Sequence, residues 1–141
     1  MRSPDLGEAY VSKAVGPALD LTETYLHLSD GAAVTPIEVG PDFWSMLSGR
    51  QDLQAGRLVV VTHETEDWST WEMHPAGDEV VSLLSGTVNL ILQDGTREWT
   101  VALRARASVI VPQGVWHRAI VHEPSDLLFI TRGAGTQHRP V

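Results

Sequence analysis

The sequence predicts an all-β domain, a small antiparallel barrel or sandwich, that carries one short helix in its N-terminal third. From residue 58 onward, segments rich in β-branched and other apolar residues recur at a spacing of roughly ten residues. Each of them ends at turn-forming residues, of which Asp94-Gly95 is the strongest hairpin signal. Short strands at such regular spacing are typical of an antiparallel sandwich or a small barrel. The length of 141 residues is near the usual size of a single domain.

The predicted strands account for most of the chain after residue 57. They cover residues 58–64, 71–74, 79–84, 87–92, 97–103, 108–111, 115–121 and 126–131. Pro112 falls at the end of one strand, where its missing N–H removes no hydrogen bond from the ladder. Gly86, Gly95 and Gly114 are interpreted as turn residues with a positive φ, which glycine adopts without steric cost.

The N-terminal third has a different pattern. Residues 24–29 alternate loosely between apolar and polar, which predicts an edge strand. Phe43, Met46 and Leu47 recur at helical spacing and predict a short helix. The C-terminal tail either lies on the surface or folds back over the body. We therefore divide the chain into an N-terminal extension that packs on the barrel, the barrel itself and the tail, which cover residues 1–56, 57–135 and 136–141.

The composition excludes several kinds of protein. The chain has no cysteine, so disulfides, thiolate metal sites and a cysteine nucleophile are ruled out. Ten Lys and Arg stand against eighteen Asp and Glu, a net charge of −8, which argues against a nucleic acid as partner because phosphate binding needs clustered cations. No apolar run approaches the length of a membrane helix, and charged residues interrupt the apolar runs near the N-terminus. We therefore expect a cytoplasmic protein with no membrane partner.

Four residues from two distant segments carry the candidate chemistry. Glu72 and His74 are two positions apart, so their side chains leave the same face of a strand. Glu79 follows after a turn, at the start of the next predicted strand. His117 lies far along the chain, shortly after the Pro112-Gln113-Gly114 turn. If the sheet closes on itself, these side chains meet at one point.

A common focus of these side chains is typical of a metal site. Two imidazoles with one or two carboxylates suit a divalent ion such as iron, manganese, nickel, cobalt or zinc. Glu72 has three possible roles: a further ligand, a hydrogen-bonding partner of a ligand, or a general base that faces the pocket. The alternative is that His74, Glu79 and His117 are ordinary polar residues at strand ends, without an ion.

The two segments resemble the two conserved motifs of the cupin superfamily, in particular its small, single-domain bacterial-type members. The first family motif has a His-x-His pair, then a Glu, then a Gly. In this sequence Glu72-Met73-His74 is followed by Glu79 and, after six further residues, by Gly86. The second motif has Pro-x-Gly followed by a His, and here Pro112-Gln113-Gly114 precedes His117.

The resemblance implies a fold and a set of ligands. The fold is a double-stranded β-helix, which is a jelly-roll-like barrel. His74, Glu79 and His117 stand at positions of the family's metal ligands, and Glu72 stands where the family has its first metal-binding His. The site then has either three ligands or two His and two carboxylates. A second carboxylate shifts the preference from copper towards harder ions such as manganese or iron.

The resemblance also implies a function. It suggests a metal-dependent enzyme that acts on a small molecule by dioxygenation, isomerisation or decarboxylation. In such an enzyme Glu72, as the catalytic group, or Glu79 could move protons. The alternative is a cupin that binds or senses a small molecule without turnover. Small barrels of this type often pair, so the resemblance also implies a homodimer.

Overall fold

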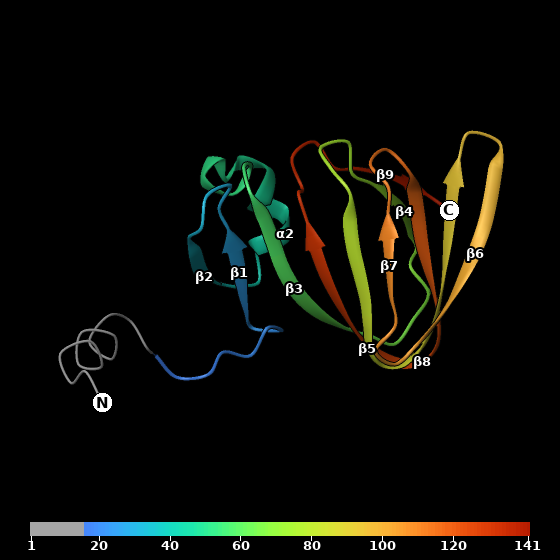
Figure 1. Ribbon diagram of the computed structural model, residues 1–141, viewed down its shortest axis with the longest axis horizontal. Helices are drawn as coiled ribbons and strands as arrows, with labels where there is room; N and C mark the ends of the chain where they lie inside the picture. Colours follow the sequence, from blue (N-terminus) through green and yellow to red (C-terminus); the bar gives the residue numbers. More distant parts are fainter. Residues whose placement is uncertain (1–15) are drawn as a thin grey trace, which may run out of the picture.

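The fold is almost entirely β with one short helix, which confirms the class that the sequence predicts (Figure 1). The computed structural model describes residues 16–141. Between β2 and β3 lie α2 (Phe43–Met46) and two short 3-10 turns, η1 (Leu47–Gly49) and η2 (Gln51–Leu53). The strands in chain order are β1 (Thr24–Leu28), β2 (Val34–Glu38), β3 (Arg57–Glu64), β4 (Thr70–Met73), β5 (Glu79–Asp94), β6 (Arg97–Arg104), β7 (Ser108–Val111), β8 (Trp116–Thr131) and β9 (Gln137–Pro140).

Two long antiparallel strands, β5 and β8, organise the barrel. They pair from Val80 opposite Ile130 to Gln93 opposite Trp116. β6 and β7 pair with β5, while β3 and β4 pair with β8. The sequence predicts two shorter strands in place of each long strand, and that prediction is wrong. The two pairs of shorter predicted strands are 79–84 with 87–92 and 115–121 with 126–131.

Each long strand stays continuous because it bends without reversing. The register between β5 and β8 shifts within residues 83–88, a departure from regular pairing that is typical of a β-bulge. Gly86 adopts a φ of 95° in this bend. On the opposite strand the Ser125 hydroxyl accepts a hydrogen bond from the Thr87 N–H (3.1 Å) and donates one to the Glu123 carbonyl (2.7 Å). Backbone groups at the irregularity therefore keep partners although the ladder is interrupted.

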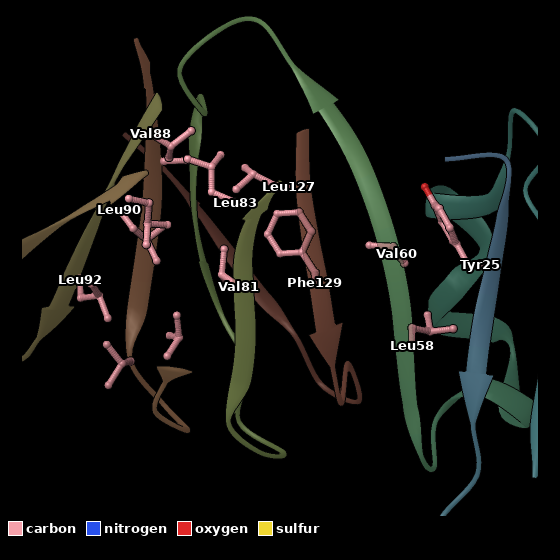
Figure 2. Packing of buried hydrophobic residues seen from close by; sticks show 14 of the residues in the cluster. Tyr25, Leu58, Val60, Val81, Leu83, Val88, Leu90, Leu92, Leu127 and Phe129 are labelled. Atoms are coloured by element: carbon pink, nitrogen blue, oxygen red, sulfur yellow. The ribbon is translucent and has the colours of Figure 1, made fainter. Parts of the chain in front are cut away.

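Apolar side chains from the inner faces of the strands fill the barrel (Figure 2). On β5 the buried positions alternate with partly exposed ones, as expected for a strand with one face on the core. Val81, Leu83 and Leu90 of β5 and Leu127 of β8 have no exposed surface at all. Each leucine buried in this way contributes about 1.5–3 kcal/mol through the hydrophobic effect.

The N-terminal strands extend the sheet beyond β3. β1 pairs with both β2 and β3, so the edge position predicted for residues 24–29 belongs to β2, which carries Pro36. The predicted helix is confirmed as the single turn α2, whose Phe43 ring packs edge-on against Tyr25 with 5.3 Å between ring centroids. Among the residues described, no helix is long and apolar enough to cross a membrane.

The C-terminal segment folds back over the body instead of lying free on the surface. β9 pairs antiparallel with β4, with Glu72 opposite His138. The Arg139 guanidinium lies over two indole rings, 5.4 Å from the centroid of Trp71 and 4.4 Å from that of Trp116. Such cation–π contacts contribute about 0.5–1 kcal/mol each when exposed and more when desolvated. They fix β9 against the two strands that carry candidate ligands.

A substitution at the bend tests its steric requirement. A Cβ at residue 86 would overlap Ser125 Oγ and lie 2.6 Å from the Pro124 carbonyl oxygen, whereas a Cβ at Gly95 would meet nothing within 4 Å. Both glycines have a positive φ, 95° and 60°. We expect Gly86→Ala to lower the free energy of unfolding by about 3 kcal/mol or more, and Gly95→Ala by about 1 kcal/mol. Chemical denaturation measures both, and equal losses would contradict the steric account.

Candidate metal centre

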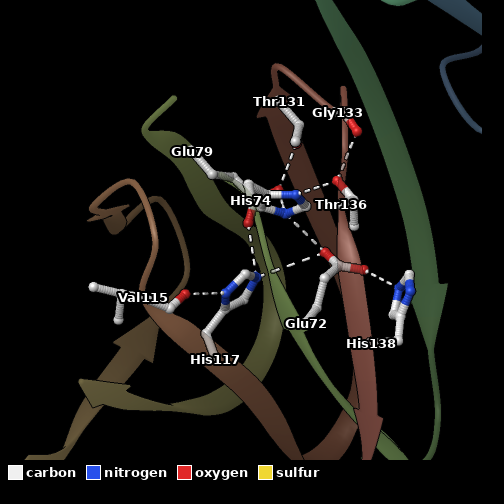
Figure 3. A network of polar contacts seen from close by, with 9 residues as sticks. All are labelled: Glu72, His74, Glu79, Val115, His117, Thr131, Gly133, Thr136 and His138. Atoms are coloured by element: carbon white, nitrogen blue, oxygen red, sulfur yellow. Dashed lines mark hydrogen bonds and ion pairs between the residues drawn. The ribbon is translucent and has the colours of Figure 1, made fainter. Parts of the chain in front are cut away.

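Four side chains converge at one end of the barrel (Figure 3). Each of Glu72, His74, Glu79 and His117 offers one nitrogen or oxygen atom, and these atoms all lie within 4.8 Å of one another. The structure thus brings together all four residues that the sequence singled out. Glu72 lies on β4 directly opposite His117 on β8, and Glu79 is the first residue of β5.

Two turns are tied together at this end of the barrel. The Gly114 N–H donates to the His74 carbonyl (3.0 Å), and the Gln113 N–H donates to the Asp78 carboxylate (2.8 Å). The Gln113 side-chain amide donates to the carbonyl of Pro75 (2.6 Å). The turn after β4 and the turn before β8 therefore hold each other. These hydrogen bonds fix the loops that flank His74, Glu79 and His117.

The cluster is buried, and its charged atoms are close together. The side chains of His117, Glu79 and His74 are 0%, 2% and 6% exposed, while that of Glu72 is 24% exposed. His74 Nε2 lies 2.9 Å from Glu72 Oε1 and 3.0 Å from Glu79 Oε2. His117 Nε2 lies 3.0 Å from Glu79 Oε1 and 3.6 Å from Glu72 Oε1. Glu72 is thus the one member of the four with substantial access to solvent.

Hydrogen bonds behind the rings aim both Nε2 atoms at the centre. The Thr136 hydroxyl donates to the Gly133 carbonyl (2.8 Å), so it accepts the bond from His74 Nδ1 (2.7 Å). His117 Nδ1 faces the Val115 carbonyl (3.3 Å), which can only accept. Both Nδ1 atoms therefore carry hydrogen, and in the neutral imidazole each Nε2 presents a lone pair. Metal-binding histidines are oriented in this way.

Three atoms of the cluster have no hydrogen-bond partner. They are His74 Nε2, His117 Nε2 and Glu79 Oε1, each fully shielded from solvent. The carboxylate oxygens of Glu72 and Glu79 lie 2.9–3.6 Å from the two ring nitrogens. Leaving a buried polar atom unsatisfied costs about 1–3 kcal/mol, and more for a charged group. A cation bound at the point where these atoms converge would satisfy all three, so the donor set fits a metal ion.

The metal-free cluster holds two protons that an ion would replace. Burial lowers the pKa of His74 and of His117, but the adjacent carboxylates of Glu72 and Glu79 outweigh burial and raise both pKa values to about 9. Burial raises the pKa of the two carboxyls, yet the imidazolium groups outweigh it and hold both below their usual range. At neutral pH the two imidazolium groups therefore balance the two carboxylates. A divalent ion with two neutral imidazoles would balance the same two carboxylates.

A cavity of about 680 Å³ opens onto the cluster, within the size range of small-molecule sites. Glu72, His74 and Glu79 line it on the polar side. The apolar part of the wall comes from the short helical segment, from β3, from β8 and from the loop before β4. Its apolar side chains are Trp44, Leu47, Leu53, Leu58, Val60, Trp68 and Phe129.

Three polar residues of the site were missed from the sequence. The Thr131 hydroxyl donates to Glu79 Oε2 (2.5 Å), and Thr136 supports His74. His138 Nε2 lies 3.0 Å from Glu72 Oε2. Thr136 and His138 belong to the segment treated as a tail, whose richness in glycine and polar residues was the sole available signal.

Comparison with known proteins places the chain among cupins. The profile of the family described as Cupin domain matches residues 58–133, more than half of the chain. A cupin-2 domain protein from Shewanella frigidimarina is 21% identical over 53% of this chain and 69% of its own, with a TM-score of 0.47. A protein from Neisseria meningitidis is 22% identical over 52% and 71%, with a TM-score of 0.45.

A further similar structure is a hydroquinone 1,2-dioxygenase from a Sphingomonas species. It is 18% identical over 53% of this chain and 59% of its own, with a TM-score of 0.48. All three likenesses are partial and concern the fold alone. No curated protein matches the chain significantly.

Metal binding should release protons. Because the pKa values of His74 and His117 are about 9 in the metal-free protein, both rings are charged at neutral pH and must lose their Nε2 protons to an ion. We expect the metal affinity to rise with pH and to level off above about 9, with about two protons released per ion near neutral pH. Calorimetric titration in buffers of different ionisation enthalpy measures the release. A metal affinity independent of pH, without proton release, would contradict the account.

Loss of the cation–π contacts of Arg139 should lower the metal affinity, although Arg139 is not one of the four candidate ligands. Removing the guanidinium takes away one of the contacts that hold β9, which directly follows the Thr136 hydroxyl that orients His74. We expect Arg139→Ala to reduce metal affinity by about tenfold, in the range typical of residues that support a ligand. Arg97→Ala is the matched control, since Arg97 makes a similar contact with Trp99 (5.5 Å) on β6. Equal metal affinity in both variants would show that β9 does not support the centre.

Proposed function

This chain belongs to the family of cupin domains, and from that premise we propose that it is a metal-dependent enzyme acting on a small molecule. The ion would be divalent iron, manganese, nickel or zinc, held by His74, His117 and Glu79, with Glu72 either as a fourth ligand or as a general base beside them. The substrate would occupy the cavity beside it. The reaction would be of the oxygenase, isomerase or decarboxylase type.

One observation carries the proposal. Buried nitrogen and oxygen atoms that lack partners face one another at the polar side of a cavity large enough for a small molecule. Purely structural ion pairs would be expected to have well-directed hydrogen bonds, because unsatisfied buried charges destabilise a fold. Such a set of buried donor atoms beside an open cavity is better explained as a binding site for a divalent ion.

Some residues of the site would hold the ion, and another would move protons. A bound ion supplies Lewis acidity or activates dioxygen. The two imidazoles and Glu79 are deeply buried and hydrogen-bonded from behind, which suits fixed ligands. Glu72 is partly exposed, and its Oε2 faces His138, whose side chain is 55% exposed. A proton taken up at Glu72 Oε2 would therefore have a route to solvent through His138, which suits a general base.

We further propose that the protein forms a homodimer. Three exposed apolar side chains come from β2 and α2, and they are Val34, Trp44 and Met46, 57%, 56% and 64% exposed. Contact between two copies would remove these side chains from water. Light scattering on the purified chain measures the molecular mass.

Replacement of the two imidazoles tests the metal centre. We expect His74→Ala/His117→Ala to abolish retention of divalent metal, because the two neutral nitrogen ligands are lost. His122→Ala is the matched control, since His122 is exposed and lies outside the cluster. Elemental analysis gives the metal content, and the melting temperature with and without added metal gives the stabilisation that binding produces. A wild-type protein without metal, whose melting temperature no divalent ion raises, would contradict the proposal.

Turnover separates an enzyme from a binding module. The metal-loaded protein is incubated with small-molecule substrates, with and without dioxygen, and the products are identified by mass spectrometry. We expect Glu72→Gln to lower turnover by about 100-fold or more, as loss of a general base does, while Glu66→Gln outside the cluster leaves it unchanged. Ligand binding without any product would instead favour the alternative of a non-catalytic binding or sensing cupin.

A further inference from the structure

The part of the chain that the structure describes places no permanent cation in the cavity beside the candidate metal centre. Among the residues that the structure describes, no Lys or Arg contributes to its wall. The ionisable groups of the wall are three carboxylates and two histidines, namely Glu64, Glu72, Glu79, His74 and His138. A carboxylate or phosphate that entered the cavity would find no guanidinium or ammonium to pair with among the described residues of the wall.

Arginines that neighbour wall residues in the sequence, including Arg57 beside Leu58 and Arg139 beside His138, do not line the cavity, and two others form ion pairs. Arg50 forms an ion pair with Asp52 (2.8 Å), and Arg132 forms one with Asp30 (2.8 Å). Both lie next to segments that line the cavity, yet neither lines it. Neutralisation of an anionic ligand would therefore depend on the ion and the histidines alone.

The charges around a bound divalent ion would also disfavour the binding of an anionic ligand. Two positive charges on a divalent ion are balanced by Glu72 and Glu79, and Glu64 adds a further negative charge to the wall. Once His74 binds an ion through Nε2, it contributes no charge. A buried anion without a partner costs several kcal/mol in general, whereas an uncharged ligand meets no such penalty.

The remaining wall favours a flat, apolar ligand. The Trp68 ring lies 5.9 Å from the Phe129 ring and 5.9 Å from the ring of His117, so it connects the metal centre to the apolar wall. Val60 on β3 is paired with Phe129 on β8 (Figure 2) and extends this wall. Aromatic rings pack favourably on such surfaces. A cavity of about 150 Å³ already holds benzene, so this one accommodates a ring with substituents.

We propose that the cavity takes an uncharged, flat, mainly apolar molecule with one oxygen-bearing end, of the phenol or enol class, and that it rejects molecules bearing a carboxylate or phosphate. The oxygen-bearing end would face the metal centre, and the ring would lie along Trp68. This assignment rests on the proposed function, because it requires an ion at the polar side of the cavity.

Binding of two matched probes to the zinc-loaded protein tests the assignment. Zinc has no redox chemistry, so oxidative turnover does not interfere with the measurement. The probes are p-ethylphenol and p-hydroxyphenylacetate, which share the phenol ring and differ by a carboxylate. We expect calorimetry to show that the acid binds about tenfold more weakly, or not at all, because its carboxylate is left unpaired.

A charge reversal in the wall should change the preference. Glu64→Lys replaces an anion of the cavity wall by a cation, and we expect it to strengthen binding of p-hydroxyphenylacetate by about tenfold. Binding of p-ethylphenol should stay within about twofold, since the neutral probe senses no charge. Glu66→Lys is the matched control: it makes the same charge change at an exposed residue outside this cavity.

The outcomes separate the two proposals. If the protein fails to bind zinc, the proposed function is wrong and the assignment falls with it. If zinc binds, the assignment alone is overturned by an acid that binds as tightly as p-ethylphenol, or by absence of any binding of p-ethylphenol. An equal gain in acid binding for Glu64→Lys and Glu66→Lys would also overturn it, because the effect would then come from the net charge of the protein.

Discussion

The bend of the β5–β8 ribbon is the constraint on which the candidate site depends. Glu79 begins β5, while His117 pairs with Leu92 near the other end of the same strand. In an unbent ribbon these positions would lie roughly 40 Å apart, at about 3.3 Å per residue. The observed separation between His117 Nε2 and Glu79 Oε1 is 3.0 Å. Only a ribbon folded over on itself brings the two ligands together, so the irregular backbone around Gly86 and Ser125 is a condition for any chemistry at this centre.

The same arrangement creates an electrostatic conflict that an ion would resolve. The folded ribbon places two carboxylates and two imidazoles in a buried space. Paired charges in such a space stabilise a protein little, because desolvation offsets most of their attraction. The hydroxyls of Thr131 and Thr136 satisfy the outer atoms of the cluster, yet the inner atoms stay without partners. Hydrogen bonds from the surrounding structure, rather than the mutual attraction of the four side chains, therefore orient the inner atoms toward one point.

The motifs in the sequence were sufficient to predict the fold class and the four convergent residues. Glu72 and His74 are two residues apart along a strand, which placed them on one face. The Pro-x-Gly turn precedes His117, as in the second cupin motif. The continuity of β5 and β8 could not be predicted, because Ser85-Gly86 and Glu123-Pro124 look like chain reversals in a local pattern. Whether such residues reverse a strand or merely bend it depends on long-range pairing, which local propensity does not contain.

The contribution of the C-terminal segment could not be predicted either, because it follows from the pairing of β9 with β4 and from the stacking of Arg139 on two tryptophans.

Anomalous diffraction would show whether a divalent ion binds where the four side chains converge. The crystals are grown from protein that was expressed in metal-replete medium. We expect a peak about 2.1 Å from Nε2 of both His74 and His117. Well-ordered imidazoles with no anomalous peak between them, even after soaking with manganese or zinc, would show that the cluster is not a metal site.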